Sequence, residues 1–165
     1  MREDQTNIKK LISDLDYKNN FVKINKSHIV KLNSILNEIT EPRISILSQD
    51  GALAAWLIVQ HADYNVEFQK DYLNLTKELL KKDPEDVYLQ GIAYLEDRIA
   101  IKENKLQVYG TQFHDSNTDP KTLIPHPILD PKNLNLRRKK MGLQSIEEYI
   151  KELSEVYGKK VNYTY

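Results

Sequence analysis

The run from Ala52 to Gln60 constrains the fold more than any other stretch. It contains the longest apolar block in the chain and would be apolar on nearly every side of a helix. A helix without a polar face must be covered by other elements, so this run predicts a core helix. It is much shorter than the roughly 20 apolar residues that a membrane-spanning helix needs. The chain is therefore expected to fold in water, with no membrane partner.

Helical spacing of apolar residues recurs in the stretches 8–15, 30–39, 68–80, 87–95 and 146–156, and residues 131–140 suggest a basic helix. The first of these helices is expected over Gln5–Leu15. The asparagine-rich segment 18–26 predicts a connector, and Ser27 after it is an expected N-cap. Ile44–Leu47 is expected to be extended. Ser145 and the residues that follow it have the spacing of a capping box.

The periodicity changes after residue 98. Ile99, Ile101, Leu106 and Val108 alternate with polar residues, which predicts a small β-hairpin at about 98–112. The following stretch to Asp130 is rich in proline and lacks a periodic pattern, so a long loop is expected there.

A chain of 165 residues suits one domain. The sequence predicts a mainly α fold, a compact helical domain of about six helices with that one hairpin. We expect an N-terminal helix and polar connector over 1–26 and the globular domain over 27–158. The tail 159–165 is expected to fray or to add an edge strand.

Composition excludes several classes of function. There is no cysteine, which rules out disulfides, thiolate catalysis and zinc–thiolate sites. Lys plus Arg equals Asp plus Glu at 24 each, so no overall field favours nucleic acid. The polar first residues do not resemble a signal peptide, and a cytoplasmic location is expected.

His61 and Asp63 are the first candidates for chemistry. A histidine titrates near neutral pH, so His61 suits a general base or acid that Asp63 orients. The simpler alternative is a half-buried histidine beside an aspartate that only caps the next helix.

Asp97 and Arg98 follow where a helix is expected to end. Asp97 is an alternative partner for the histidine, and Arg98 has the planar donors that bind an anion. The simpler alternative is an internal salt bridge between an aspartate and this arginine.

The sequence QVYGTQ at 107–112 is rich in neutral donors and acceptors. In a strand, Gln107, Tyr109 and Thr111 would share one face, and Gly110 would let a ligand approach the backbone closely. Together with Gln112 these groups could position a substrate but could not act as acid or base at neutral pH. Alternatively, the tyrosine belongs to the core and the glutamines bind loop backbone.

Two further groups are weighed. Arg137 and Arg138 begin a run of four basic residues and are candidate anion ligands, whereas Lys139 and Lys140 suit a solvated helix face. A metal site formed by histidines and carboxylates would use His61, Asp63, His114, Asp115 and His126. No known metal motif has their spacing, so neither a metal nor another cofactor is expected.

Four stretches taken together resemble an uncharacterised bacterial family, a domain of unknown function. They are AAWLIVQHAD with FQ, AYLEDRI, QVYGTQ, and RRKKMGL followed by EEY, and the resemblance covers roughly Ile29 to Leu153. It implies signature positions at Gln60, His61, Asp63, Gln69, Asp97, Arg98, Gln107, Tyr109, Gly110, Thr111, Gln112, Arg137, Arg138 and Gly142. His114 and His126 lie outside that signature. The sequence has Thr40-Glu41-Pro42 where the family is expected to have Gly-Trp-Pro.

A polar signature drawn from separate segments suggests one shared pocket. The first hypothesis is a small hydrolase or transferase acting on a polar or anionic small ligand. In it His61, Asp63 and Asp97 are catalytic, and the ligand is bound by Gln60, Gln69, Arg98, Gln107, Tyr109, Thr111, Gln112, Arg137 and Arg138. The alternatives are a non-catalytic module that binds a ligand or peptide, and a purely structural polar network.

Overall fold

The computed structural model describes residues 15–163, and the side chains of residues 21–163. The α-helices of this part are α2 (Leu15–Ile39), α3 (Ile44–Gln60), α4 (Val66–Lys82), α5 (Leu89–Lys102), α6 (Leu134–Lys140) and α7 (Ile146–Tyr157). The strands are β1 (Phe113–Asp115), β2 (Thr122–Pro125) and β3 (Lys160–Val161), and the 3₁₀ helices are η1 (Pro84–Asp86) and η2 (Pro131–Asn133). The prediction of a mainly α domain of about six helices is confirmed.

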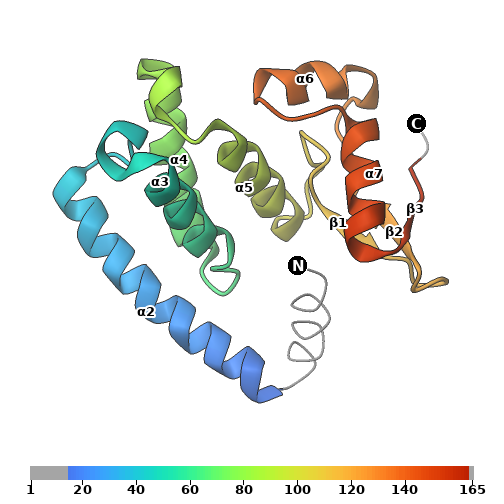
Figure 1. Ribbon diagram of the computed structural model, residues 1–165, viewed down its shortest axis with the longest axis horizontal. Helices are drawn as coiled ribbons and strands as arrows, with labels where there is room; N and C mark the ends of the chain where they lie inside the picture. The colour runs from blue at the N-terminus through green and yellow to red at the C-terminus, as the bar shows by residue number, and fades with distance from the viewer. Residues whose placement is uncertain (1–14, 164–165) are drawn as a thin grey trace.

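The helices form two groups that meet at α5. Figure 1 shows α2, α3 and α4 on one side of α5, and α6, α7 and the sheet on the other. The larger apolar cluster contains residues of α2, α3, α4 and α5. The smaller one joins α6 and α7 to the strands through Leu134, Ile146 and Tyr149. Because α5 borders both clusters, its polar residues lie where the two groups meet.

The core prediction for 52–60 is correct on one face of α3 only. Ala52, Ala55 and Val59 are buried, but Leu53 and Leu57 are 37% and 40% exposed. The described part of the chain therefore leaves some of the apolar surface of α3 exposed to solvent. No helix among the described residues combines the length and apolarity that crossing a membrane requires.

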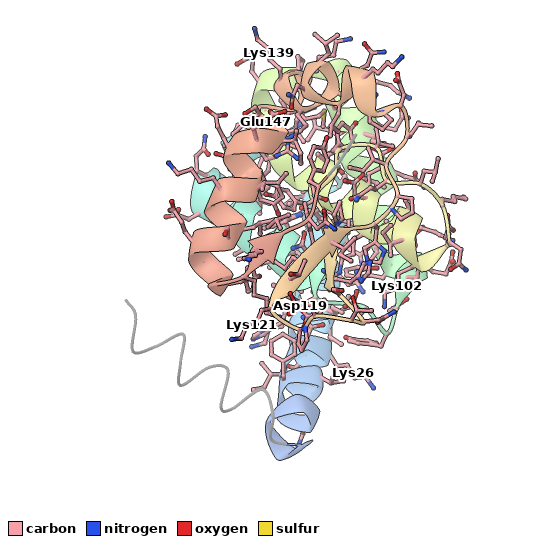
Figure 2. The ribbon with its side chains drawn as sticks, turned by 90° about the vertical axis from the view of Figure 1, so that its right-hand side faces the viewer. Lys26, Lys102, Asp119, Lys121, Lys139 and Glu147 are labelled. Carbon is pink, nitrogen blue, oxygen red and sulfur yellow. The ribbon has the colours of Figure 1, made fainter. Side chains whose placement is uncertain are left out.

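The connector expected over 18–26 is wrong, because α2 runs through it without a break. Asn25 is buried, its side-chain nitrogen donates to the Ile58 carbonyl at 3.2 Å, and its oxygen accepts from the Tyr64 hydroxyl. These contacts with α3 and the turn after it oppose the low helix propensity of asparagine. Figure 2 shows this part of α2, near Lys26, extending beyond the rest of the molecule. The helix expected over Gln5–Leu15 lies outside the described residues, apart from Leu15 at the start of α2.

Two expected local features also differ. Ser27 is not an N-cap but lies inside α2, where its hydroxyl donates to the Ile24 carbonyl at 2.8 Å. Ile44–Leu47 is not extended but forms the first turn of α3. A kink follows at Ser48, which has a φ of 68° and a ψ of 170°. The Ser48 hydroxyl accepts the Gly51 N–H at 3.3 Å and so caps the second part of the helix.

The hairpin expected at about 98–112 is wrong in position. Ile99 is buried in α5, which continues to Lys102, because the spacing of Ile92, Leu95 and Ile99 keeps one helical stripe facing the core. A loop over 103–112 follows. The hairpin is formed instead by β1 and β2, inside the stretch expected to be a long loop.

The sheet has the order β1-β2-β3, with β1 and β2 antiparallel and β2 and β3 parallel. The tail thus contributes the edge strand β3, one of the two outcomes expected for it. The capping box of Ser145 and Glu148 is confirmed at the start of α7, and Gly158 ends that helix in the left-handed region. These two ends fix α7 beside the sheet.

Candidate functional site

Asp97 lies in α5 and is completely buried. Its carboxylate accepts the backbone N–H groups of Val108 at 2.6 Å, Tyr109 at 3.0 Å and Thr111 at 3.0 Å, and the Thr111 hydroxyl at 2.9 Å. The QVYGTQ loop therefore wraps around one carboxylate in the manner of an anion-binding nest. Gly110 permits this path with a φ of 67°, and a Cβ there would lie 3.2 Å from Ile128.

Burial raises the pKa of Asp97, while the donors from Thr111, Tyr109 and Val108 oppose that shift. Both carboxylate oxygens are already occupied by the loop. The geometry thus gives Asp97 the role of an anchor for the loop rather than that of a group open to a substrate.

Gln107 closes the same loop from inside. Its side-chain nitrogen donates to the carbonyls of Gln112 at 3.1 Å and His126 at 2.7 Å, and its side-chain oxygen accepts the Gln112 N–H at 2.9 Å. The backbone of Gln107 also pairs with the segment around Ile128. This buried glutamine therefore ties the loop to the residues after β2.

Arg138 of α6 binds the loop through its carbonyl groups. It is completely buried, and its guanidinium donates to the carbonyls of Tyr109 at 2.7 Å and Gln144 at 2.8 Å. Its guanidinium carbon also lies 4.8 Å from the centre of the Tyr149 ring. Burial lowers the pKa of Arg138.

Arg137 supports the loop in a similar way. Its side chain donates to the carbonyls of Val108 at 2.8 Å and Asp130 at 3.0 Å, and to that of Leu129. Lys139, by contrast, is exposed and points away from the domain in Figure 2. The basic run is thus divided into two arginines that bind backbone and lysines that face solvent.

Asp63 and Arg98 form an ion pair between the end of α3 and α5. Arg98 Nε lies 2.8 Å from one carboxylate oxygen of Asp63, and Nη2 bonds the other oxygen. Burial alone would raise the pKa of Asp63. The hydrogen bond and the charge of Arg98 lower this pKa by more, so the net shift is downward. The salt-bridge alternative for Arg98 therefore describes the geometry, with Asp63 as the partner.

His61 follows α3 and is exposed, with its ring edge-on to Phe21 at 5.6 Å between centres. Partial burial and the Arg98 charge lower the pKa of His61, and Asp63 opposes them. Gln69 of α4 is completely buried and donates to the carbonyls of Val59 and Gln60, both at 3.1 Å. These contacts close the C-terminal end of α3.

A cleft of about 740 Å³ lies between α5, α7 and the strands. Its lining residues are Gln60, Tyr94, Arg98, Thr111, Gln112, Phe113, His114, Asp115, Leu123, Tyr149, Leu153, Tyr157 and Lys159. Four of the predicted site residues are among them, namely Gln60, Arg98, Thr111 and Gln112. His61, Asp63, Gln69, Asp97, Gln107, Tyr109, Arg137 and Arg138 are not.

Aromatic side chains form much of the cleft wall. Tyr149 lies edge-on to Tyr94 at 6.2 Å and to Phe113 at 5.9 Å between ring centres. Its hydroxyl donates to the Thr111 carbonyl at 3.3 Å, and burial raises its pKa, so it stays neutral. The wall therefore rests directly on the loop that Asp97 holds.

The polar part of the lining carries both signs of charge. Arg98 is paired with Asp63, and Lys159 is paired with Asp115. The side-chain oxygen of Gln60 is buried without a hydrogen-bond partner among the described residues.

The aromatic lining residues and Lys159 were not among the predicted site residues. Tyr149 and Leu153 were treated only as the core stripe of the last helix. Their spacing of four continues to Tyr157, which is 47% exposed, and an exposed tyrosine on an apolar stripe is the signal that was missed. Lys159 had no comparable signal, because its position depends on β3.

The five residues weighed as a metal site do not form one cluster in the structure. The described residues contain no group of three or more histidines and carboxylates placed to hold a metal ion. Only His114 and His126 come together, with 4.7 Å between ring centres.

The model of a family of unknown function, DUF6624, matches residues 9–162, so the chain belongs to that family. Neither the curated proteins nor the solved structures include a match to this chain.

Proposed function

We propose that this member of a family of unknown function is a binding domain for a small molecule, which it holds and releases unchanged. The ligand combines a flat apolar or aromatic part with a polar or anionic group. The observation that carries the proposal is the 740 Å³ cleft with aromatic walls and two cations, a volume within the roughly 300–1,000 Å³ of small-molecule sites.

The aromatic wall accounts for the flat part of the ligand. Tyr94, Phe113, Tyr149 and Tyr157 line the cleft from three different elements. Aromatic rings prefer offset or edge-to-face contacts with another ring, and such pairs add about 0.5–1.5 kcal/mol beyond the area that they bury. A ligand with one ring can make several of these contacts at once.

The two cations of the lining, Arg98 and Lys159, would bind the anionic group of the ligand. Arg98 donates to Asp63 through Nε and Nη2, which leaves Nη1 without a hydrogen bond to the described residues. Lys159 is neutralised by Asp115, and its side chain is 23% exposed. A carboxylate or phosphate would compete with these aspartates and would be held by charge-assisted hydrogen bonds.

Binding is favoured over a hydrolase or transferase because the predicted proton-transfer groups are occupied or elsewhere. A general base needs a free lone pair within hydrogen-bond reach of the substrate. The oxygens of Asp97 are filled by the loop, those of Asp63 are held by Arg98, and His61 is not in the lining. His114 lines the cleft, but its Nδ1 is bonded to a main-chain oxygen and not to an orienting carboxylate.

A thermal-shift screen tests this proposal. The compounds are aromatic carboxylates and phosphates, each paired with its neutral amide or alcohol. At 100 times the dissociation constant a ligand adds about 2.7 kcal/mol of stability, which raises Tm by about 5–11 °C in a chain of this size. The anionic member of a pair is expected to give the larger shift.

Variants then locate the effect. Tyr157→Ala removes part of the aromatic wall and Lys159→Gln removes a cation, so both are expected to weaken binding. Lys139→Gln is the matched control, because Lys139 is exposed on α6 away from the cleft lining. The proposal fails if no compound shifts the wild type, or if the two cleft variants bind every hit as tightly as Lys139→Gln does.

A further inference from the structure

Two of the four histidines are neighbours on the β1–β2 hairpin. His114 pairs with Ile124, and the His126 N–H donates to the Gln112 carbonyl at 3.1 Å, so the ladder continues for one more pair. His126 is therefore two residues beyond the partner of His114. Such diagonal residues share one face of an antiparallel pair.

We propose that His114 and His126 together bind one divalent transition-metal ion through their imidazole nitrogens. The distance between their rings carries the proposal. A Zn–N bond is about 2.0–2.1 Å, so a zinc ion lies about 3.2 Å from the centre of a ligating imidazole. Two such rings at a ligand angle of about 90–110° have centres about 4.5–5.2 Å apart. The observed separation is 4.7 Å, with the rings tilted by 54°.

A hydrogen bond prepares His114 for this role. Its Nδ1 lies 2.9 Å from the Asp115 carbonyl oxygen, which can only accept, so Nδ1 carries the hydrogen. In the neutral ring the lone pair is then on Nε2. Metal-ligating histidines usually donate their second nitrogen to a carbonyl or carboxylate in this way, which fixes the tautomer and the ring orientation.

The charge state also suits a metal. Burial lowers the pKa of His126, and the nearby His114 lowers it further, so the imidazole is neutral at pH 7. A metal ligand must have its lone pair free of a proton.

The ligand set identifies the class of ion. Imidazole suits Zn²⁺, Cu²⁺ and Ni²⁺, whereas Mg²⁺ and Ca²⁺ require oxygen ligands. The described residues offer no third histidine or carboxylate, and the Asp115 carboxylate is held by Lys159. The remaining coordination positions are open to water or to another donor, and His114 places the ion at the border of the cleft.

Calorimetric titration of the full chain with ZnCl₂ tests the site. One Zn²⁺ per chain is expected, and His114→Ala and His126→Ala should each weaken binding at least about tenfold, since even the loss of an outer-shell partner costs 10–100-fold. His28→Ala and His61→Ala are the matched controls and should bind as the wild type does. MgCl₂ should produce no binding.

Proton NMR of the histidine ring signals gives a second readout that needs no folded variant. Zn²⁺ is expected to shift or broaden two of the four signals, those of His114 and His126. The proposal is overturned if the wild type does not bind Zn²⁺, if either hairpin variant binds it as tightly, or if the affected signals belong to His28 or His61. These outcomes do not depend on whether the cleft binds a small molecule.

Discussion

The Asp97 carboxylate takes the place of water for three backbone N–H groups and one hydroxyl of a buried loop. Each of these donors would otherwise be left unpaired in the interior. Arg138 does the same for the carbonyl of Tyr109. Asp97 thus binds N–H groups of the loop and Arg138 binds a carbonyl of the same loop. Tyr149 of the aromatic cleft wall donates to the Thr111 carbonyl of this loop.

Asp97→Ala is expected to lower the free energy of unfolding by about 3–5 kcal/mol. An unsatisfied buried donor costs about 1–3 kcal/mol, and this change leaves several of them together with an uncompensated buried arginine. Urea unfolding measures the loss. Asp71→Ala, at an exposed aspartate of α4, should change stability by less than about 0.5 kcal/mol. If both variants unfold at the same urea concentration, Asp97 does not organise the loop.

The sequence predicted that the Asp97 and QVYGTQ residues would meet, and they do. It did not predict how they meet, because the partners of Asp97 are mainly backbone N–H groups, which every residue except proline has. Gln112 and Thr111 reach the cleft as the sequence suggested. Arg137 and Arg138 instead bind carbonyls, because α6 brings them against the loop and not against the cleft.

At the scale of the elements, the lengths of α2 and α5 are decided by tertiary contacts. The residues 99–108 satisfy a strand pattern as well as a helix pattern, since a short stretch contains too few apolar positions to separate the two periods. Burial of Ile99 beside Leu95 decides in favour of the helix. The helices α4 and α7 lie close to the predicted stretches 68–80 and 146–156, and both have a side-chain cap. Asn65 caps α4, so the alternative that Asp63 caps it is wrong.

The kink of α3 permits a test of backbone strain. Ser48 has a φ of 68° and a ψ of 170°, a region that glycine adopts freely and that costs other residues about 1–3 kcal/mol. Ser48→Gly is therefore expected to raise the free energy of unfolding by about 1–2 kcal/mol, since glycine at a cap loses only a few tenths. Ser48→Ala keeps the strain, loses the cap and should be about 1 kcal/mol less stable than the wild type. A glycine variant less stable than the alanine variant would contradict this explanation of the kink.

Across the whole molecule, two histidines in different parts of the fold have shifted pKa values. The pKa values of His61 and His126 are both lowered below the ordinary 6.5. At these two histidines the unfolded chain therefore binds more protons than the folded chain in slightly acidic solution. The contribution of these two histidines to the free energy of unfolding is fully present above about pH 6.5. It decreases as pH falls through their folded-state pKa values.

Urea midpoints measured across this pH range test that effect. The double variant His61→Gln/His126→Gln should lose less stability than the wild type as the solution is acidified. Asp97 acts with the opposite sign at lower pH, because its pKa is raised, but it is present in both proteins and cancels from the comparison. Equal acid sensitivity of the two proteins would show that these histidines do not contribute.

The most direct test of the binding function is an NMR titration of the ¹⁵N-labelled chain with a compound found by the thermal-shift screen. The cleft predicts that the largest amide shifts lie in three segments, at residues 94–98, 111–115 and 149–159. The amides of α2 and the first half of α4 should not respond, since neither contributes to the cleft lining. Shifts concentrated on those helices, with none at the three cleft segments, would contradict the proposal that the cleft is the binding site.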